Sequence, residues 1–105
     1  MVTATAFREA YSAGKMTALS YAQACLQEIE RSDGQIQAWE HLVPDAVRQM
    51  AEQADSASGA DDMKLLRGEP VRIKDIIDTC DAPCKWGLAE LPGRQPAADA
   101  TLVTT

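Results

Sequence analysis

The stretch TALSYAQACLQEIER, residues Thr17 to Arg31, carries the clearest structural signal in the chain. Its apolar residues recur every three or four positions, which places them on one face of an α-helix. They are Leu19, Ala22, Cys25, Leu26 and Ile29. Thr17 is a suitable N-cap, and the polar RSDG that follows favours a helix end. We therefore predict an amphipathic helix over about residues 18–31 with one face packed against the rest of the protein.

Two further helices are expected on either side of it. Thr5 can cap a helix over about residues 4–13, and Gly14 is suited to the left-handed conformation after its end. Pro44 fits the first turn of another helix over about residues 44–55, since proline lacks only an N–H that is unbonded there anyway.

The residue composition changes at RGEPVRIKDIIDT, residues Arg67 to Thr79, where β-branched side chains favour a strand over about residues 70–77. Helices followed by a strand predict an α/β fold. A single strand leaves both of its edges unpaired, so we expect residues 1–105 to be part of one larger mixed-sheet domain with no complete second domain.

Composition narrows the possible functions. The 105 residues carry a formal net charge of -6, which argues against nucleic acid or anionic lipid as a partner because both require clustered basic residues. No window approaches about 18 apolar residues, so no membrane span is expected. The odd number of cysteines, three, favours reduced thiols and a cytoplasmic location over a disulfide framework.

Cys80 and Cys84 form a CxxxC pair whose spacing matches neither the redox CxxC motif nor a complete zinc set. His41 is the only histidine, so ligands for a metal are too few. We expect no metal and no cofactor, and the role of the two thiols stays open.

Lys74 lies in the middle of the expected strand. Judged from the pattern alone, a lysine beside Ile73 is most simply a solvated residue of an edge strand.

The order of residues around Lys74 resembles the amidase-signature family, whose members carry a similar Leu-x-Gly-x-Pro-x-x-x-Lys-Asp-x-Ile segment. The matching positions are Leu66, Gly68, Pro70, Lys74, Asp75, Ile77 and Asp78, followed by Pro83, Gly87, Asp99, Ala100 and Thr101. The preceding helices extend the resemblance over nearly the whole chain. The sequence departs from the family pattern at Glu69, Ile76, Trp86 and Leu88.

The resemblance implies an amide hydrolase with a Ser, cis-Ser and Lys triad, no cofactor, and Lys74 as the base. Both serines of that family lie well downstream of the lysine. The SASG at residues 56–59 lies upstream of it in an acidic stretch, so it is no substitute.

Two hypotheses follow. The first is that the chain is the N-terminal fragment of such an enzyme, inactive alone, which meets its small amide substrate only in the complete protein. The second is a stand-alone helical interaction module that self-associates or binds a partner chain through an exposed strand edge.

Overall fold

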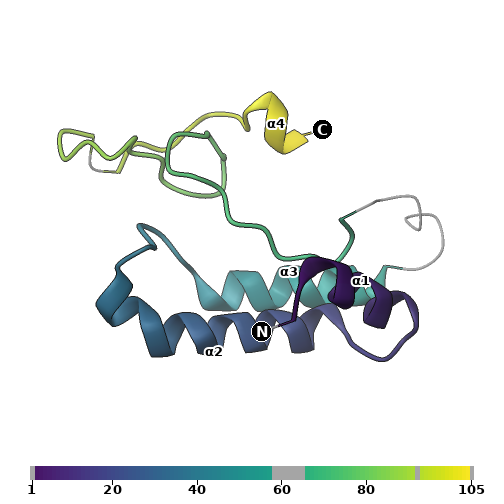
Figure 1. Ribbon diagram of the computed structural model, residues 1–105. Helices are drawn as coiled ribbons and strands as arrows, with labels where there is room; N and C mark the ends of the chain where they lie inside the picture. Colours follow the sequence, from purple (N-terminus) through teal and green to yellow (C-terminus); the bar gives the residue numbers. More distant parts are fainter. Residues whose placement is uncertain (1, 58–65, 92, 105) are drawn as a thin grey trace. The chain divides into compact units, whose positions relative to one another are not determined.

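The computed structural model describes residues 2–57, 66–91 and 93–104, which form four α-helices and no β-strand (Figure 1). The helices are α1 (Ala4–Ser12), α2 (Ala18–Ile36), α3 (Pro44–Ser56) and α4 (Thr101–Thr104). Two compact units can be separated. The helical unit comprises Met1–Ala38 and Leu42–Val71, and the loop unit comprises Trp39–His41 and Arg72–Thr105.

The expected strand at residues 70–77, and with it the α/β fold class, is wrong: the described residues are helical or irregular. The Ile77 N–H donates to the Lys74 carbonyl at 2.9 Å, which closes a turn where a strand would continue. Val71 and Ile76 remain more than 60% exposed. β-Branched residues favour extended backbone, but a strand forms only beside a partner strand, and the described part of the chain supplies none.

Helix α2 begins at the predicted cap and continues past the predicted end at residue 31 to Ile36. The Thr17 hydroxyl accepts from the Ser20 N–H, and the Ser20 hydroxyl accepts from the Thr17 N–H, which forms a capping box. The polar RSDG does not stop the helix, and within it Ser32 donates its hydroxyl to the Glu28 carbonyl at 2.7 Å. The helix ends instead at Gln37, whose φ of 53° is left-handed.

Helix α1 is capped by Thr3, whose hydroxyl accepts from the Ala6 N–H at 3.2 Å, and not by Thr5 as expected. Gly14 follows its end with a φ of 66°, which confirms the left-handed position assigned to it. Phe7 is fully buried, with its ring centroid 4.5 Å from that of Tyr21. This aromatic contact attaches α1 to α2.

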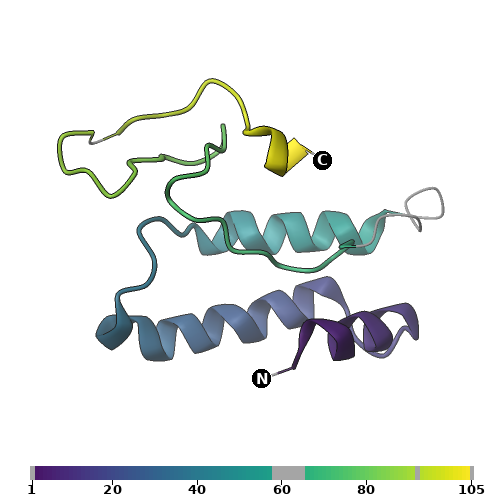
Figure 2. The same cartoon turned by 45° about the horizontal axis from the view of Figure 1, so that its top comes forward.

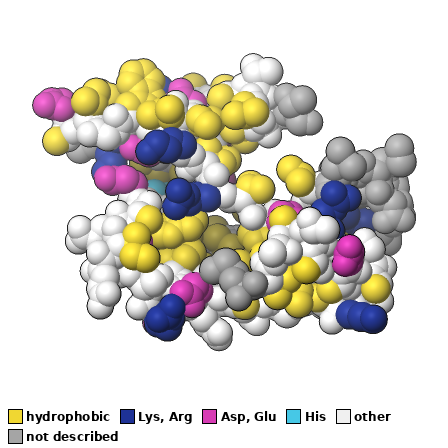
Figure 3. Space-filling model, in the orientation of Figure 1, with side chains coloured by type: hydrophobic (Ala, Val, Ile, Leu, Met, Phe, Trp, Pro, Cys, Tyr) yellow, Lys and Arg dark blue, Asp and Glu magenta, His cyan; other side chains and the backbone are white. Residues whose placement is uncertain are grey.

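Helices α2 and α3 lie side by side in both ribbon views (Figures 1 and 2). Their shared core with α1 is small, and alanines make up much of it. Its buried members are Phe7, Ala18, Tyr21, Ala22 and Ala51. Alanine lets helices approach closely but buries little apolar area, so this core contributes less stability than one built from leucine and isoleucine. Hydrophobic side chains also reach the visible surface (Figure 3).

Gly68, in the segment that resembles the amidase motif, packs against the helices. Its φ is 73°, and a Cβ atom there would lie 3.1 Å from both Ala18 Cβ and Tyr11 Cζ. A larger residue would meet both the backbone strain and the contact, so this glycine has a structural role in the helical unit.

Asp55, in the last turn of α3, caps the start of α2. Its carboxylate oxygens accept from the backbone N–H groups of Ala18 at 2.7 Å and Leu19 at 3.0 Å. A negative charge at a helix N-terminus is favourable, and these two N–H groups have no partner within the helix. Asp55 therefore joins the two longest helices by polar bonds. None of the described helices is both long and apolar enough to cross a membrane.

We expect Asp55→Ala to lower the free energy of unfolding of the helical unit by about 1–2 kcal/mol, since it removes a charged cap. Denaturant titration followed by far-UV circular dichroism measures the change. Glu52→Ala, an exposed position one turn earlier on α3, is the matched control and should stay within about 0.5 kcal/mol of wild type. Equal destabilisation by both substitutions would contradict the capping role.

Candidate functional site

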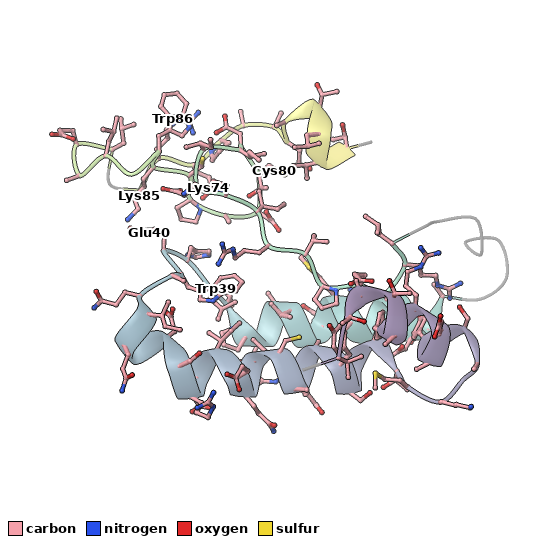
Figure 4. All side chains as sticks on the ribbon, in the orientation of Figure 1. Trp39, Glu40, Lys74, Cys80, Lys85 and Trp86 are labelled. Carbon is pink, nitrogen blue, oxygen red and sulfur yellow. The ribbon has the colours of Figure 1, made fainter. Side chains whose placement is uncertain are left out.

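Lys74 lies in the loop unit, at the end of an extended segment and before a tight turn (Figure 4). The residue is exposed, and its ammonium forms no ion pair within the described ranges. Two aspartates follow it in the sequence, Asp75 and Asp78, and both bind a later part of the loop unit.

Asp75, the next residue, is bound to the segment Lys85–Gly87 through its backbone and its side chain. Its carboxylate accepts from the N–H of Lys85 at 2.9 Å and of Gly87 at 3.0 Å. Its carbonyl accepts from the Trp86 N–H at 2.9 Å. The two backbone bonds to the carboxylate lower the pKa of Asp75, so it is ionised at neutral pH.

The segment that binds Asp75 is a tight turn with unusual backbone angles. Trp86 has a φ of 57° and Gly87 a φ of 72°, and the Leu88 N–H donates to the Lys85 carbonyl at 3.0 Å. Left-handed backbone is easy for glycine, but in a bulky residue such as Trp86 it costs about 1–2 kcal/mol. The surrounding contacts must offset this strain.

Asp78 and Arg94 form the most shielded ion pair of the described residues. Both carboxylate oxygens of Asp78 accept from the guanidinium, at 2.7 and 2.8 Å, and each side chain is 30% exposed or less. Arg94 also donates to the Cys84 carbonyl at 3.1 Å and stacks over the Trp86 ring, 4.4 Å from its centroid. The Arg94 hydrogen bonds hold the pKa of Asp78 far below its usual range.

Asp99 fixes the backbone at Cys80. Its carboxylate accepts from the Cys80 N–H at 2.7 Å, while Gln95 donates its side-chain amide to the Cys80 carbonyl at 2.6 Å. The hydrogen bond with Asp99 raises the pKa of the Cys80 thiol, and burial raises that of Cys84. Both thiols are therefore protonated at neutral pH, a state unsuited to metal binding or nucleophilic attack. The described residues contain no cluster of three or more His, Cys, Asp or Glu side chains that could hold a metal ion.

The short segment Trp39–His41, which connects α2 and α3, belongs to the same unit. Glu40 pairs with the Lys85 ammonium at 2.8 Å (Figure 4), and the Arg72 guanidinium lies 5.7 Å from the centre of the Trp39 ring. The Glu40–Lys85 pair is largely exposed, so it contributes little to stability.

Sequence reasoning identified Lys74 and its two neighbouring aspartates but missed the residues that bind the aspartates. Arg94 lies 16 residues from Asp78 and carries no local signal, because proline and glycine between them leave its spacing undefined. Trp86 stands out in the sequence only as a departure from the family pattern. That departure is the one sequence feature that points to its role in this loop.

Of the alternative serine segment at residues 56–59, the structure describes Ser56 and Ala57. Ser56 ends α3 and donates its hydroxyl to the Glu52 carbonyl at 2.8 Å. Ser58 and Gly59 lie outside the described residues.

Comparisons with known proteins agree with the motif. A family model described as Amidase matches residues 20–105. The A subunit of glutamyl-tRNA(Gln) amidotransferase from Chloroflexus aurantiacus is 36% identical over 103 residues, which are 97% of this chain and 21% of that protein. Its counterpart from Dinoroseobacter shibae is 34% identical over 103 residues, 98% of this chain and 21% of that protein. The chain thus spans about a fifth of the length of these relatives, and no solved structure matches it.

The lowered pKa values predict that acid weakens the loop unit. Asp75, Asp78 and Asp99 all have folded-state pKa values below the ordinary 3.8, so their contribution to stability is present above that pH and is lost as pH falls below it. Trp39 and Trp86, the only tryptophans, both lie in this unit. We expect the denaturant midpoint measured by tryptophan fluorescence to fall between about pH 5 and pH 2.

Asp78→Asn tests the cause of this pH dependence. It should lower the midpoint at pH 7 and reduce the further loss in acid, because one titrating carboxylate is gone. Asp45→Asn is the control: Asp45 is 94% exposed in the helical unit and should leave both values unchanged. Equal midpoints for the wild type at pH 7 and pH 2.5 (roughly a unit below the ordinary aspartate pKa) would contradict the prediction.

Proposed function

The chain belongs to the amidase family, and from that premise we propose that it is the N-terminal part of an amidase-signature enzyme that hydrolyses amide C–N bonds, with Lys74 as catalytic base. The observation that carries the proposal is the family match over residues 20–105, which includes the whole segment around Lys74. The two serines of the proposed triad are then supplied by the rest of the complete enzyme.

The chemistry explains why a lysine suits this role. A neutral lysine amine accepts a proton from a bridging serine hydroxyl, which in turn takes one from the nucleophilic serine. That serine attacks the amide carbonyl carbon, the C–N bond breaks, and the leaving amine takes up the proton. Water then cleaves the acyl-serine ester and restores the enzyme.

The exposure of Lys74 supports a site that is completed by further protein. A lysine in water keeps its charge, and a lysine that acts as a base must lose part of its hydration. In the described residues Lys74 is exposed, and so are the apolar side chains of Val71, Ile73 and Ile76 near it in the chain. We propose that the remaining four-fifths of the enzyme, judged from the relatives' length, covers this segment and desolvates the amine.

The relatives suggest the class of substrate. Their name describes an amidotransferase, so we propose that the complete enzyme cleaves a small amide donor whose nitrogen is passed on. The alternative, a stand-alone interaction module, was motivated by an exposed strand edge and by the uncovered face of the helix at residues 18–31. The described residues contain no strand, so the first of these two grounds is lost.

The isolated 105-residue chain should hydrolyse no simple amide, because one member of a three-residue triad cannot perform nucleophilic catalysis. Ammonia release from a panel of small amides measures this. Turnover by the purified chain that disappears in Lys74→Ala would overturn the proposed division of the triad.

A chimera tests the role of Lys74 itself. The matching fifth of the Chloroflexus aurantiacus protein is replaced by this chain, and amide hydrolysis is measured. Lys74→Ala should lower kcat by about 10²-fold to 10⁴-fold, and Lys74→Arg should not rescue it, because arginine stays protonated.

Lys15→Ala is the matched control for the chimera. Lys15 is exposed in the connection between α1 and α2, and its removal should leave kcat within about twofold of the parent. An active Lys74→Ala chimera would show that Lys74 is not the base.

A further inference from the structure

We propose that Arg94 is a positioning residue for Lys74, an inference that rests on the proposed function. With Asp75, Asp78, Cys84 and Trp86 it forms a closed set of contacts, here called the Arg94 clasp, which holds the backbone that follows Lys74. The clasp also holds the Asp78 carboxylate on a guanidinium, which keeps that carboxylate from pairing with the Lys74 ammonium.

One side of the clasp is built on Asp75. Four donors reach this residue: the N–H groups of Lys85 and Gly87 bind its carboxylate, and the Trp86 N–H and the Cys84 thiol bind its carbonyl. Three successive backbone N–H groups thus bind one residue, the outer two through its negative charge and the middle one through its backbone carbonyl. The residue after Lys74 is thereby attached to the 84–87 segment through its carboxylate and its carbonyl.

The other side is built on Arg94. Cys84 and Arg94 exchange two bonds: the Cys84 N–H donates to the Arg94 carbonyl at 3.0 Å, and the guanidinium donates to the Cys84 carbonyl at 3.1 Å. The same guanidinium holds Asp78 by two parallel bonds. Asp78 lies four residues after Lys74, and the turn between them is closed by the Ile77 N–H on the Lys74 carbonyl. The contacts therefore run from Asp75 through Cys84 and Arg94 to Asp78, and the turn at residues 74–77 joins the two aspartates.

The strained backbone at Trp86 shows that the clasp opposes a conformational preference. Trp86 keeps a left-handed φ of 57° while its N–H binds Asp75 and its ring stacks on Arg94. Such conformations persist only where surrounding contacts over-determine them, and they cluster at functional sites. The stack and the ion pair both depend on the planar guanidinium.

The consequence for Lys74 is chemical. A lysine paired with a carboxylate is held in its charged form, which cannot accept a proton. Two carboxylates lie one and four residues from Lys74. Backbone N–H groups bind the first, which keeps its charge and still attracts Lys74, whereas the Arg94 guanidinium neutralises the second, so Asp78 does not compete for the Lys74 amine.

The first experiment measures the clasp in the 105-residue chain by NMR. Arg94→Lys keeps the positive charge but loses the two-pronged bond and the flat stacking surface. We expect hydrogen exchange at the Lys85, Trp86 and Gly87 amides to accelerate by about tenfold or more, and the backbone scalar coupling of Lys74 to move toward the averaged value of a mobile residue. Arg48→Lys, in the ion pair with Asp45 on α3, is the matched control and should change neither.

The outcome that overturns the proposal is a Lys74 coupling that stays at its wild-type value while protection at residues 85–87 is lost. Arg94 would then stabilise the loop alone. If Arg94→Lys unfolds the loop unit, Asp78→Asn provides the same comparison, because it removes the charge but keeps a hydrogen-bonding side chain. An unchanged Lys74 coupling in that variant also overturns the proposal.

The second experiment uses the chimera and separates positioning from stability. At a temperature where all variants are folded, Arg94→Lys should lower kcat with KM unchanged and move the pH profile to higher pH, because lysine cannot hold both Asp78 oxygens and the one it leaves can pair with Lys74. A change in KM alone, or an unshifted profile, counts against the clasp. An active Lys74→Ala chimera would refute the proposed function, whereas the NMR result on the isolated chain would stand independently of it.

Discussion

Aspartate carboxylates that accept hydrogen bonds from backbone N–H groups connect separate segments of this protein, in which large buried apolar side chains are few. In the helical unit Asp55 bonds the first two N–H groups of α2, and in the loop unit Asp75 and Asp99 bind the segments at Lys85–Gly87 and Cys80. Each bond is charge-assisted, which makes it stronger than a bond between neutral groups. Because the core is built largely from alanine, such bonds do much to fix how the segments are arranged.

The residues that resemble the amidase motif fall into two groups once their contacts are known. Gly68, Asp75 and Asp78 each have a partner within the structure. Gly68 packs closely on α1 and α2, the Asp75 carboxylate accepts from two backbone N–H groups, and the Asp78 carboxylate binds a guanidinium. Lys74 differs, because it is exposed and forms no ion pair within the described residues.

How much of the fold could be predicted depended on how local each signal was. The start of α2 was predictable because Thr17 and Ser20 are three residues apart and bond each other. Its end was not, because Ser32 and Asp33 are compatible with either a helix or a turn, and the Asp33 carboxylate accepts from the Ala38 N–H just beyond the longer helix. The strand at residues 70–77 failed for a related reason: the β-branched side chains favour extended backbone, but a ladder needs a second strand.

The sequence by itself determined where α2 and α3 begin and the order of motif residues that identifies the amidase family. These depend on spacings of one or two helical turns or on the order of residues alone. Only the tertiary structure decided that Asp55 caps a helix 37 residues away and that Arg94 binds Asp78 across 16 residues. The physical reason is that a charged side chain forms its bond with whichever partner the fold brings within about 3 Å, and residue spacing across loops does not encode that distance.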